Sequence, residues 1–384
     1  MIKCALTGKP LQTPIYHSQS NRSVTSLSEV YHGSTIVYLN QDIGHLQTKE
    51  IENIDAYYDK QYEFFNQSEE DDILYKVVNG KEIFRQQHQI DTLLSKIKFE
   101  SDMKVLDYGC AKGTVMKRLS GENPNVLTYL FDVSQMYVHL WERFLPSDRY
   151  ASYYPKDEWN GSFDVITSFF AFEHTPDPIK ELLTIKSLLK ANGIFYCIVP
   201  NVFENTGDFI VADHVHHYSE VSLRYMFSKV GLNVIEVDSQ SHFAAFIVIG
   251  RNTDVKSISY TITQSDLVRT NQECLDIANY WKNLQVKIRR FEQEIGNRES
   301  AIYGAGVYGN FIATCIQNLS NVKCFIDQNP LLKGKKMMEK PILHPSEIPS
   351  EISKLYIGLN PKIAKEAIYN INDWKQNEYE YLFL

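Results

Sequence analysis

The stretch KVLDYGCAKG, residues 104–113, decides the fold, because an apolar run that ends in an acid is followed at once by glycines. The run up to Asp107 predicts a buried strand, and Gly109 and Gly113 predict the turn that leads into a helix. Glycines let a ligand approach the backbone closely, since no Cβ stands in the way. Ligands of parallel sheets bind at this point, beyond the carboxyl end of a strand. We therefore expect a nucleotide-like ligand at this turn.

Five further short runs of apolar, β-branched or aromatic residues alternate with helical stretches between residues 126 and 250. Together with the first, the runs are MKVLDYG, VLTYLFD, FDVITSFF, GIFYCIVP, NVIEVDS and FAAFIVIG. Strands that are interleaved with helices predict a largely parallel sheet covered on both faces. The fold class expected is therefore α/β.

The length of 384 residues allows two or three domains, each with its own core. Residues 1–85 are irregular and rich in polar and tyrosine side chains, which favours a small docking module. Residues 86–250 contain the alternating strands and helices. Helical periodicity predicts that residues 251–298 are a linker with one long helix. Residues 299–384 then form a smaller Rossmann-like βαβ domain.

The composition favours a folded protein that binds small molecules. Hydrophobic residues make up 43% of the chain and charged residues 22%, as in globular proteins. The net charge is −8 and no basic tract is present, which argues against nucleic-acid binding. Neither a signal-peptide core nor a membrane-spanning apolar run is found. The six cysteines form no C-x-x-C pair, so we expect reduced thiols in a cytoplasmic protein.

A second acid is placed to bind a nucleoside. The strand LTYLFD ends in Asp132, whose carboxylate can accept hydrogen bonds from two ribose hydroxyls. VLDYGCAKG, LFDVS and FDVITSFFAFEHTPDP (163–178) together resemble the nucleoside-binding motifs of class I S-adenosylmethionine-dependent methyltransferases. This resemblance implies a Rossmann-like core with S-adenosylmethionine as its cofactor. The residues that it assigns to the cofactor are Asp107, Gly109, Gly113, Asp132 and Phe170.

One position departs from the family pattern D-x-G-x-G-x-G, because Ala111 stands at the middle glycine. Its methyl group is accommodated if the turn does not require a positive φ there. The glycine turn alone would equally suit another nucleotide-binding domain. The later motifs EHTPDP, LLKANGIFYCIVPN and DHVHHYSEVSLRYMFSKVGL, in this order, favour the methyltransferase interpretation.

Methyl transfer is an in-line displacement from a sulfonium, so the enzyme must align the acceptor and see that it has lost a proton. We expect His214 to be the base, with its ring oriented by the adjacent carboxylate of Asp213. His174, after the fourth strand, is expected to polarise or position the acceptor. Its alternative is to cap the next helix or to bond to a backbone carbonyl. His217 is expected to contact the substrate or to support the same loop.

The three-part organisation resembles a narrower group, the nucleotide-sugar C-methyltransferases of deoxysugar biosynthesis. The resemblance implies methylation of a nucleotide-linked keto-sugar in deoxysugar, surface-polysaccharide or natural-product biosynthesis. The group's Glu-His pair maps onto Asp213 and His214, and its tyrosine maps onto Val211. C-methylation is ranked slightly ahead of O-methylation, although the missing tyrosine weakens it. The tyrosines expected to stack over the cofactor or substrate, or else to belong to the core, are Tyr57, Tyr58 and Tyr62.

That group also has an N-terminal cluster of zinc-binding cysteines. Here Cys4 remains, but Thr7 stands where the second cysteine would be. His45 alone cannot complete a set of four ligands. We therefore expect no metal.

A second glycine turn, AIYGAGVYGN (301–310), fits the dinucleotide pattern G-x-G-x-x-G, and Asp327 follows near the end of the next strand. The chain that remains allows only one mononucleotide half. We expect Gly304 and Gly306 to contact the nucleotide of the acceptor or to serve only a structural turn. The alternatives left open are an NAD-dependent sugar-nucleotide oxidoreductase or epimerase, and a non-catalytic sugar-nucleotide-binding protein.

Overall fold

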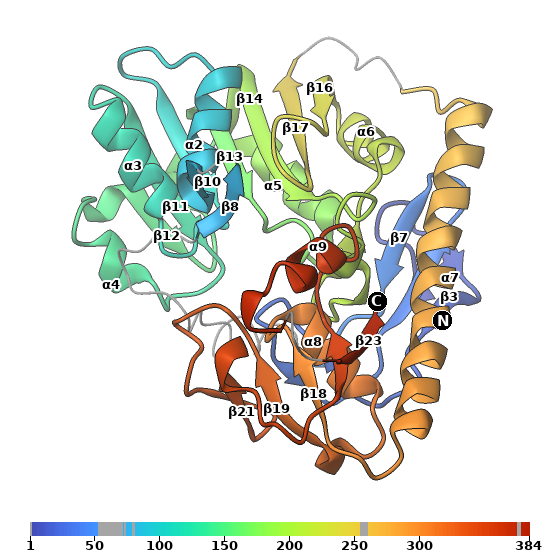
Figure 1. The fold of residues 1–384 in the computed structure, drawn as a ribbon. Helices are drawn as coiled ribbons and strands as arrows, with labels where there is room; N and C mark the ends of the chain where they lie inside the picture. The colour runs from blue at the N-terminus through green and yellow to red at the C-terminus, as the bar shows by residue number, and fades with distance from the viewer. Residues whose placement is uncertain (1, 53–71, 73, 79–80, 254–259, 375–377) are drawn as a thin grey trace.

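The fold is described from a computed structural model, which covers residues 2–52, 72, 74–78, 81–253, 260–374 and 378–384. Figure 1 shows a large α/β core, an N-terminal β module and a smaller C-terminal α/β domain. The long helix α7 (Gln264–Ile295) runs beside the N-terminal strands and reaches the C-terminal domain, so it joins these two parts along one side of the molecule.

The core is a seven-stranded sheet that is parallel except for β17, which confirms the α/β class predicted from the sequence. In spatial order, the strands are β12 (Tyr150–Ser152), β11 (Leu127–Asp132), β10 (Lys104–Tyr108), β13 (Phe163–Phe169), β14 (Leu189–Pro200), β17 (Ala245–Asn252) and β16 (Leu232–Asp238). The helices of this part are α2 (Arg85–Lys96), α3 (Thr114–Glu122), α4 (Val138–Trp141), α5 (Pro178–Leu188) and α6 (Glu220–Lys229). All six predicted strands are present.

The strand order places a ligand site beside β10. The chain continues from β10 to β11 on one side of the sheet, and later returns to β10 with β13 on the other. A crevice therefore forms outside the carboxyl end of β10, where the strand order reverses. Val105 and Leu106 in this strand are fully buried, which anchors the strand between the helical layers.

The N-terminal module shares a sheet with the core. Its four strands in spatial order are β15 (His216–His217), β7 (His45–Thr48), β6 (Ile36–Asn40) and β3 (Pro14–His17). β15 belongs to the segment between β14 and α6, so the core supplies one edge of this sheet. Among the described residues, the N-terminal region also has three two-stranded sheets: β1 (Ile2–Lys3) with β2 (Pro10–Leu11), β4 (Ser23–Val24) with β5 (Val30–Tyr31), and β8 (Leu74–Val78) with β9 (Lys81–Phe84).

Hydrogen bonds from two side chains hold the first turn of the chain, which contains Cys4. The Gln47 side chain accepts a hydrogen bond from Ala5 N at 2.8 Å and donates one to Lys3 O at 3.0 Å. Asn40 donates through Nδ2 to Thr7 Oγ1 at 2.9 Å. The position at which the resemblance would place a second cysteine is therefore occupied by a hydrogen-bonded threonine.

The C-terminal domain has a six-stranded sheet in which only β20 runs antiparallel. Its strands in spatial order are β20 (Lys336–Met337), β21 (Lys340–Leu343), β19 (Val322–Ile326), β18 (Ser300–Tyr303), β22 (Lys354–Ile357) and β23 (Glu380–Phe383). Its helices are α8 (Val307–Cys315) and α9 (Ala364–Tyr369). Trp281 of α7 packs on Phe311 of α8, which fixes this domain against the long helix.

The six cysteines are all buried and unpaired, as expected of small core residues. Within the described ranges of the chain, no helix is both long and apolar enough to span a membrane.

Candidate active site

A cleft of about 1030 Å³ lies beyond the carboxyl ends of β10, β11 and β13. All three parts of the molecule line it. The N-terminal module contributes Ser26, the core contributes most of the wall, and the C-terminal domain contributes Val307 and Tyr308 from the start of α8. The cleft is therefore a shared site rather than a pocket of the core alone.

Backbone geometry explains the first glycine turn. Gly109 and Gly113 have φ values of +82° and +70°, which L side chains rarely adopt. A Cβ on Gly109 would lie 2.7 Å from Ala171 Cβ, and one on Gly113 would lie 2.7 Å from Leu130 Cδ1. Ala111 also has a positive φ, +44°, so the turn does require this conformation at the departing position, and an alanine adopts it.

Asp132 secures this turn and faces the cleft. Its Oδ2 accepts a hydrogen bond from Ala111 N at 2.8 Å, and its Oδ1 accepts one from Ser134 N at 3.1 Å. Burial raises the pKa of Asp132 to about 6, although these backbone donors act in the opposite direction. Each carboxylate oxygen has a second lone pair. The side chain can therefore hold the turn and bind a ribose diol together.

Two other predicted cofactor residues line the same wall. Asp107 is 2% exposed and accepts a hydrogen bond from Thr167 Oγ1 at 2.9 Å. Burial raises its pKa to about 7, and the charge of Asp132 adds to this shift. Phe170 follows β13 with φ +54°, and the Arg85 guanidinium lies 4.8 Å from the centre of its ring. Of the five predicted cofactor residues, only Gly113 does not line the cleft, because it packs behind the turn.

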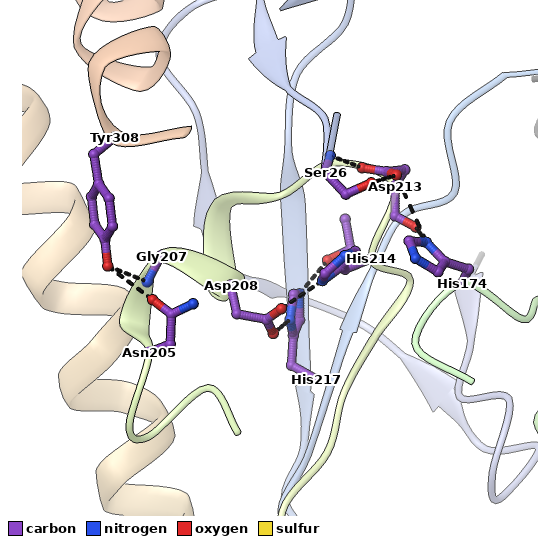
Figure 2. Close-up of polar contacts among 10 residues, drawn as sticks. Ser26, His174, Asn205, Gly207, Asp208, Asp213, His214, His217 and Tyr308 are labelled. Carbon is purple, nitrogen blue, oxygen red and sulfur yellow. Dashed lines mark hydrogen bonds and ion pairs between the residues drawn. The ribbon is translucent and has the colours of Figure 1, made fainter. Parts of the chain in front are cut away.

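A histidine–carboxylate cluster lines the cleft, and Figure 2 shows its two histidines, His174 and His214. Glu173 and His174 follow β13, and His214 comes from the loop between the 3₁₀ helix η3 (Thr206–Ile210) and β15. The ring centres of His174 and His214 lie 4.7 Å apart, with the rings nearly perpendicular. The peptide carbonyl of Asp213 accepts a hydrogen bond from His174 Nδ1 at 3.1 Å. The predicted alternative for His174, a bond to a backbone carbonyl, is therefore observed, although the residue also lines the cleft.

Asp208 in η3 bridges two histidines (Figure 2). Its carboxylate oxygens accept hydrogen bonds from His214 Nδ1 at 2.5 Å and from His217 Nδ1 at 2.6 Å. His217 Nε2 lies 2.9 Å from Thr48 Oγ1. Both ring nitrogens of His217 are thus bound within the protein, and the residue does not line the cleft. His217 therefore supports its loop through Asp208 and Thr48, and its place outside the cleft disagrees with the predicted substrate contact.

The orientation of Asp213 also differs from the prediction. Its carboxylate accepts hydrogen bonds from Ser26 N at 2.7 Å and Ser26 Oγ at 2.6 Å, and Oδ2 lies 3.7 Å from His174 Nδ1. The carboxylate that directly orients His214 is Asp208, because η3 brings it to the Nδ1 edge of that ring. Asp213 instead connects the N-terminal module to His174.

The buried cluster shifts the pKa values of its three members. Burial, together with the charge of His214, lowers the pKa of His174 to about 4. Burial also disfavours a charged His214, but the Asp208 carboxylate outweighs it and the pKa of His214 rises to about 9. Burial raises the pKa of Glu173 to about 7. The Asp208 carboxylate thus favours the protonated form of His214, whereas the predicted role as a base requires the unprotonated form.

Comparison with known proteins supports the donor site. Residues 83–237 match a protein family described as a methyltransferase domain, and the glycine turn, Asp132 and the Glu173–His174 pair all lie inside this range. The core is a class I S-adenosylmethionine-dependent methyltransferase domain. The chain is an enzyme, S-adenosylmethionine is its methyl donor, and the match gives no support to an NAD-dependent oxidoreductase.

Two similar solved structures each cover less than half of this chain. One is a SAM-dependent methyltransferase from Aquifex aeolicus, with 21% identity, 44% of this chain and 92% of that chain covered, and a TM-score of 0.36. Another is an S-adenosylmethionine-dependent methyltransferase from Mesorhizobium loti, with 13% identity, 43% and 97% coverage, and a TM-score of 0.35. No curated protein matches the sequence.

The residues of this methyltransferase fit the donor. The open backbone of the turn suits the methionine moiety, and Asp132 offers acceptors to the ribose. Glu173 and His174 are close to the same turn, since Ala171 contacts Gly109. When bound, the donor supplies an electrophilic methyl group. The protein's task is to hold it in line with an acceptor.

The second glycine turn contributes to the cleft through its helix. Of its residues, Val307 and Tyr308 line the cleft, whereas Gly304 and Gly306 do not. Tyr308 Oη accepts a hydrogen bond from Gly207 N at 3.2 Å and donates one to Asn205 Oδ1 at 3.0 Å (Figure 2). The C-terminal domain is thus bonded directly to the segment that carries Asp208. Tyr57, Tyr58 and Tyr62, which we expected near the donor, lie outside the described residues.

Replacing Asp132 by Ala is expected to weaken binding of S-adenosylhomocysteine by about 1 to 3 kcal/mol, because charge-assisted bonds to the ribose are lost. Asp327→Ala is a matched control. Asp327 accepts a hydrogen bond from Ala305 N at 2.8 Å in the second turn, as Asp132 does in the first. Isothermal titration should show a weaker affinity only for Asp132→Ala. An unchanged affinity in that variant would remove Asp132 from the donor site.

Donor affinity is expected to fall as the pH drops below about 6, the pKa of Asp132. Ribose hydroxyls donate to the ionised carboxylate, so binding is strongest above this pKa and weakens as protonation increases. Titrations between about pH 7.5 and about pH 5 measure the effect. Asp132→Asn should flatten the profile. Asp107 titrates in both proteins, but its pKa should be lower in the variant because the charge of Asp132 helps to raise it. A wild-type affinity that does not change with pH would contradict the assignment.

Proposed function

We propose that this enzyme transfers a methyl group from S-adenosylmethionine to a sugar carried on a nucleotide. One observation carries the proposal: a single cleft connects the donor turn, the Glu173–His174–His214 cluster and the start of α8. A small acceptor would need only the core. A cleft that extends to a second Rossmann-like domain suits an acceptor with a nucleotide as a handle.

Cationic side chains in the cleft suit such an acceptor, although carboxylates line it too. Among the described residues, the lysine and arginine side chains that line it are Arg85, Lys112 and Lys180. A sugar nucleotide carries a negatively charged diphosphate, which cations inside a cleft attract. The first two residues of α8 also face the cleft, and the N-terminus of a helix favours anions. These features support a phosphate-bearing acceptor even though the net charge of the chain is −8.

The sugar is proposed to lie against the Glu173–His174–His214 cluster. A ketone there would be polarised by the histidines, and its neighbouring carbon would accept the methyl group. Val211 also lines the cleft, at the position where the C-methyltransferases have a tyrosine. An apolar side chain cannot stabilise an enolate, so this observation favours a hydroxyl acceptor as the second candidate.

The test is calorimetry with S-adenosylhomocysteine, followed by a panel of sugar nucleotides and by mass spectrometry of reactions with S-adenosylmethionine. A nucleotide-linked sugar should bind to the complex and gain one methyl group, and NMR of the product then shows whether carbon or oxygen is methylated. Donor binding without methylation of any sugar nucleotide would refute the proposed substrate and leave the methyltransferase assignment intact.

A further inference from the structure

The Glu173–His174–His214 cluster has the composition of a metal site. One potential ligand atom from each residue lies within 4.8 Å of those of the other two. Glu173 and His214 are buried, and His174 is partly exposed. Two imidazoles and one carboxylate are a ligand set used by zinc and by non-haem iron, both of which leave positions open for water or substrate.

The hydrogen bonds of the two histidines support this interpretation. His214 donates through Nδ1 to the Asp208 carboxylate, and His174 donates through Nδ1 to the Asp213 carbonyl. Because Nδ1 carries the hydrogen in both rings, Nε2 is the nitrogen with a lone pair that can bind an ion. Histidines that ligate metals usually donate their other N–H to a carboxylate or a backbone carbonyl, which fixes the tautomer and the ring direction. Here His214 donates to a carboxylate and His174 donates to a backbone carbonyl.

Glu173 provides an independent observation. It is 1% exposed, and its Oε2 has no hydrogen-bond partner among the residues that the structure describes. A buried carboxylate oxygen without a partner is costly unless a cation compensates it. Asp208 and Asp213 add two more buried carboxylates nearby. The local excess of negative charge is what a divalent cation would neutralise.

We propose that Glu173, His174 and His214 bind a divalent transition-metal cation whose open positions face the cleft. Ligand atoms about 2.1 Å from such an ion are about 3 to 4 Å apart, so the three side chains must close slightly around it. Binding at Nε2 also displaces the proton of His214. The role of the ion rests on the proposed function. It would bind the acceptor oxygen as a Lewis acid and stabilise the negative charge that develops there.

This role resolves a difficulty of the proposed reaction. Val211 offers no hydrogen bond to an enolate or alkoxide, whereas a cation at the cluster stabilises either anion. Asp208 then acts as a positioning residue that holds His214, and Tyr308 stabilises the backbone next to Asp208 by its bond to Gly207 N. The C-terminal domain would thus contribute to the geometry of the metal site.

The test uses the full-length protein after dialysis against a chelator. Titration with Zn²⁺ by calorimetry should show one ion per chain, and Co²⁺ should give the visible absorption of a nitrogen- and oxygen-ligated site. Glu173→Gln and His214→Asn should each lower the Zn²⁺ affinity at least about tenfold. His139→Asn, which removes an exposed histidine outside the cleft, should leave it unchanged.

Binding of S-adenosylhomocysteine to each variant verifies that it is folded. The proposal is overturned if the chelated wild-type protein binds no Zn²⁺, or if the affinity is the same in folded Glu173→Gln. Because the metal titration needs no sugar, its result is independent of the substrate panel. A one-to-one Co²⁺ spectrum with no methylated sugar would retain the metal site and reject only the substrate.

Discussion

His214→Asn is expected to reduce the turnover number by about 10²- to 10⁴-fold, the range for removal of a group that handles a proton or an anion in the reaction. His214 lies in the cleft beside Glu173 and His174, and its Nδ1 donates to the Asp208 carboxylate. The donor residues around Asp132 are separate from it, so the affinity for S-adenosylhomocysteine should stay within about twofold of wild type. Steady-state kinetics with the sugar nucleotide that accepts the methyl group and calorimetry with S-adenosylhomocysteine measure the two effects.

The matched control for this variant is again His139→Asn. His139 is exposed on α4 and does not line the cleft, so turnover should be unchanged. A folded His214→Asn enzyme with wild-type turnover would show that the cluster takes no part in methyl transfer. A loss of donor binding in the same variant would instead place His214 in the donor pocket.

Gly309→Ala is expected to destabilise the protein by about 3 kcal/mol, at the upper end of overpacking effects. A Cβ on Gly309 would lie 1.8 Å from the carbonyl oxygen of Gly304, and a Cβ on the neighbouring Gly358 would lie 2.5 Å from Gly309 Cα. A backbone contact cannot be relieved by a rotamer change. Thermal and urea unfolding measure the loss.

Gly306→Ala is the control within the same motif. Its φ is −114°, and a Cβ there would meet nothing within 4 Å, so stability should change by less than about 0.5 kcal/mol. Equal stability of the two variants would contradict the packing explanation. The contrast is expected because Gly309 permits close packing of β18, α8 and the segment after β22, whereas Gly306 does not contribute to this packing.

The strands and the donor turn were predictable from the sequence because their signals are local. An apolar run such as that before Asp107 buries itself in any sheet, and the glycines that follow allow only a few backbone paths. The acid at Asp132 could likewise be recognised because it ends the next strand. The positive φ of Ala111 could not be predicted, since alanine shows no preference for it.

The details of the catalytic cluster could not be predicted because they depend on contacts between distant segments. Sequence adjacency suggested Asp213 as the partner of His214, but the 3₁₀ helix η3 brings Asp208 to that ring, and Ser26 binds Asp213 instead. The Glu173–His174 pair and His214 meet only in the folded chain. A possible ligand set is therefore invisible in the sequence.

The second glycine turn shows a different limit of sequence analysis. Its pattern matches a dinucleotide fingerprint, yet Gly304 and Gly309 are required by backbone packing. Tyr308 of this domain is hydrogen-bonded to Gly207, next to Asp208, yet no nucleotide-binding pattern singles it out. The same spacing of glycines can thus arise from packing of a helix on a strand without any ligand.

A crystal structure with S-adenosylhomocysteine bound tests most directly whether donor and acceptor share this cleft. We expect the Asp132 carboxylate to accept hydrogen bonds from both ribose hydroxyls, and the sulfur to face Glu173, His174 and His214. A complex in which the ribose lies away from Asp132, or the sulfur points away from the histidines, would contradict the assignment of the active site.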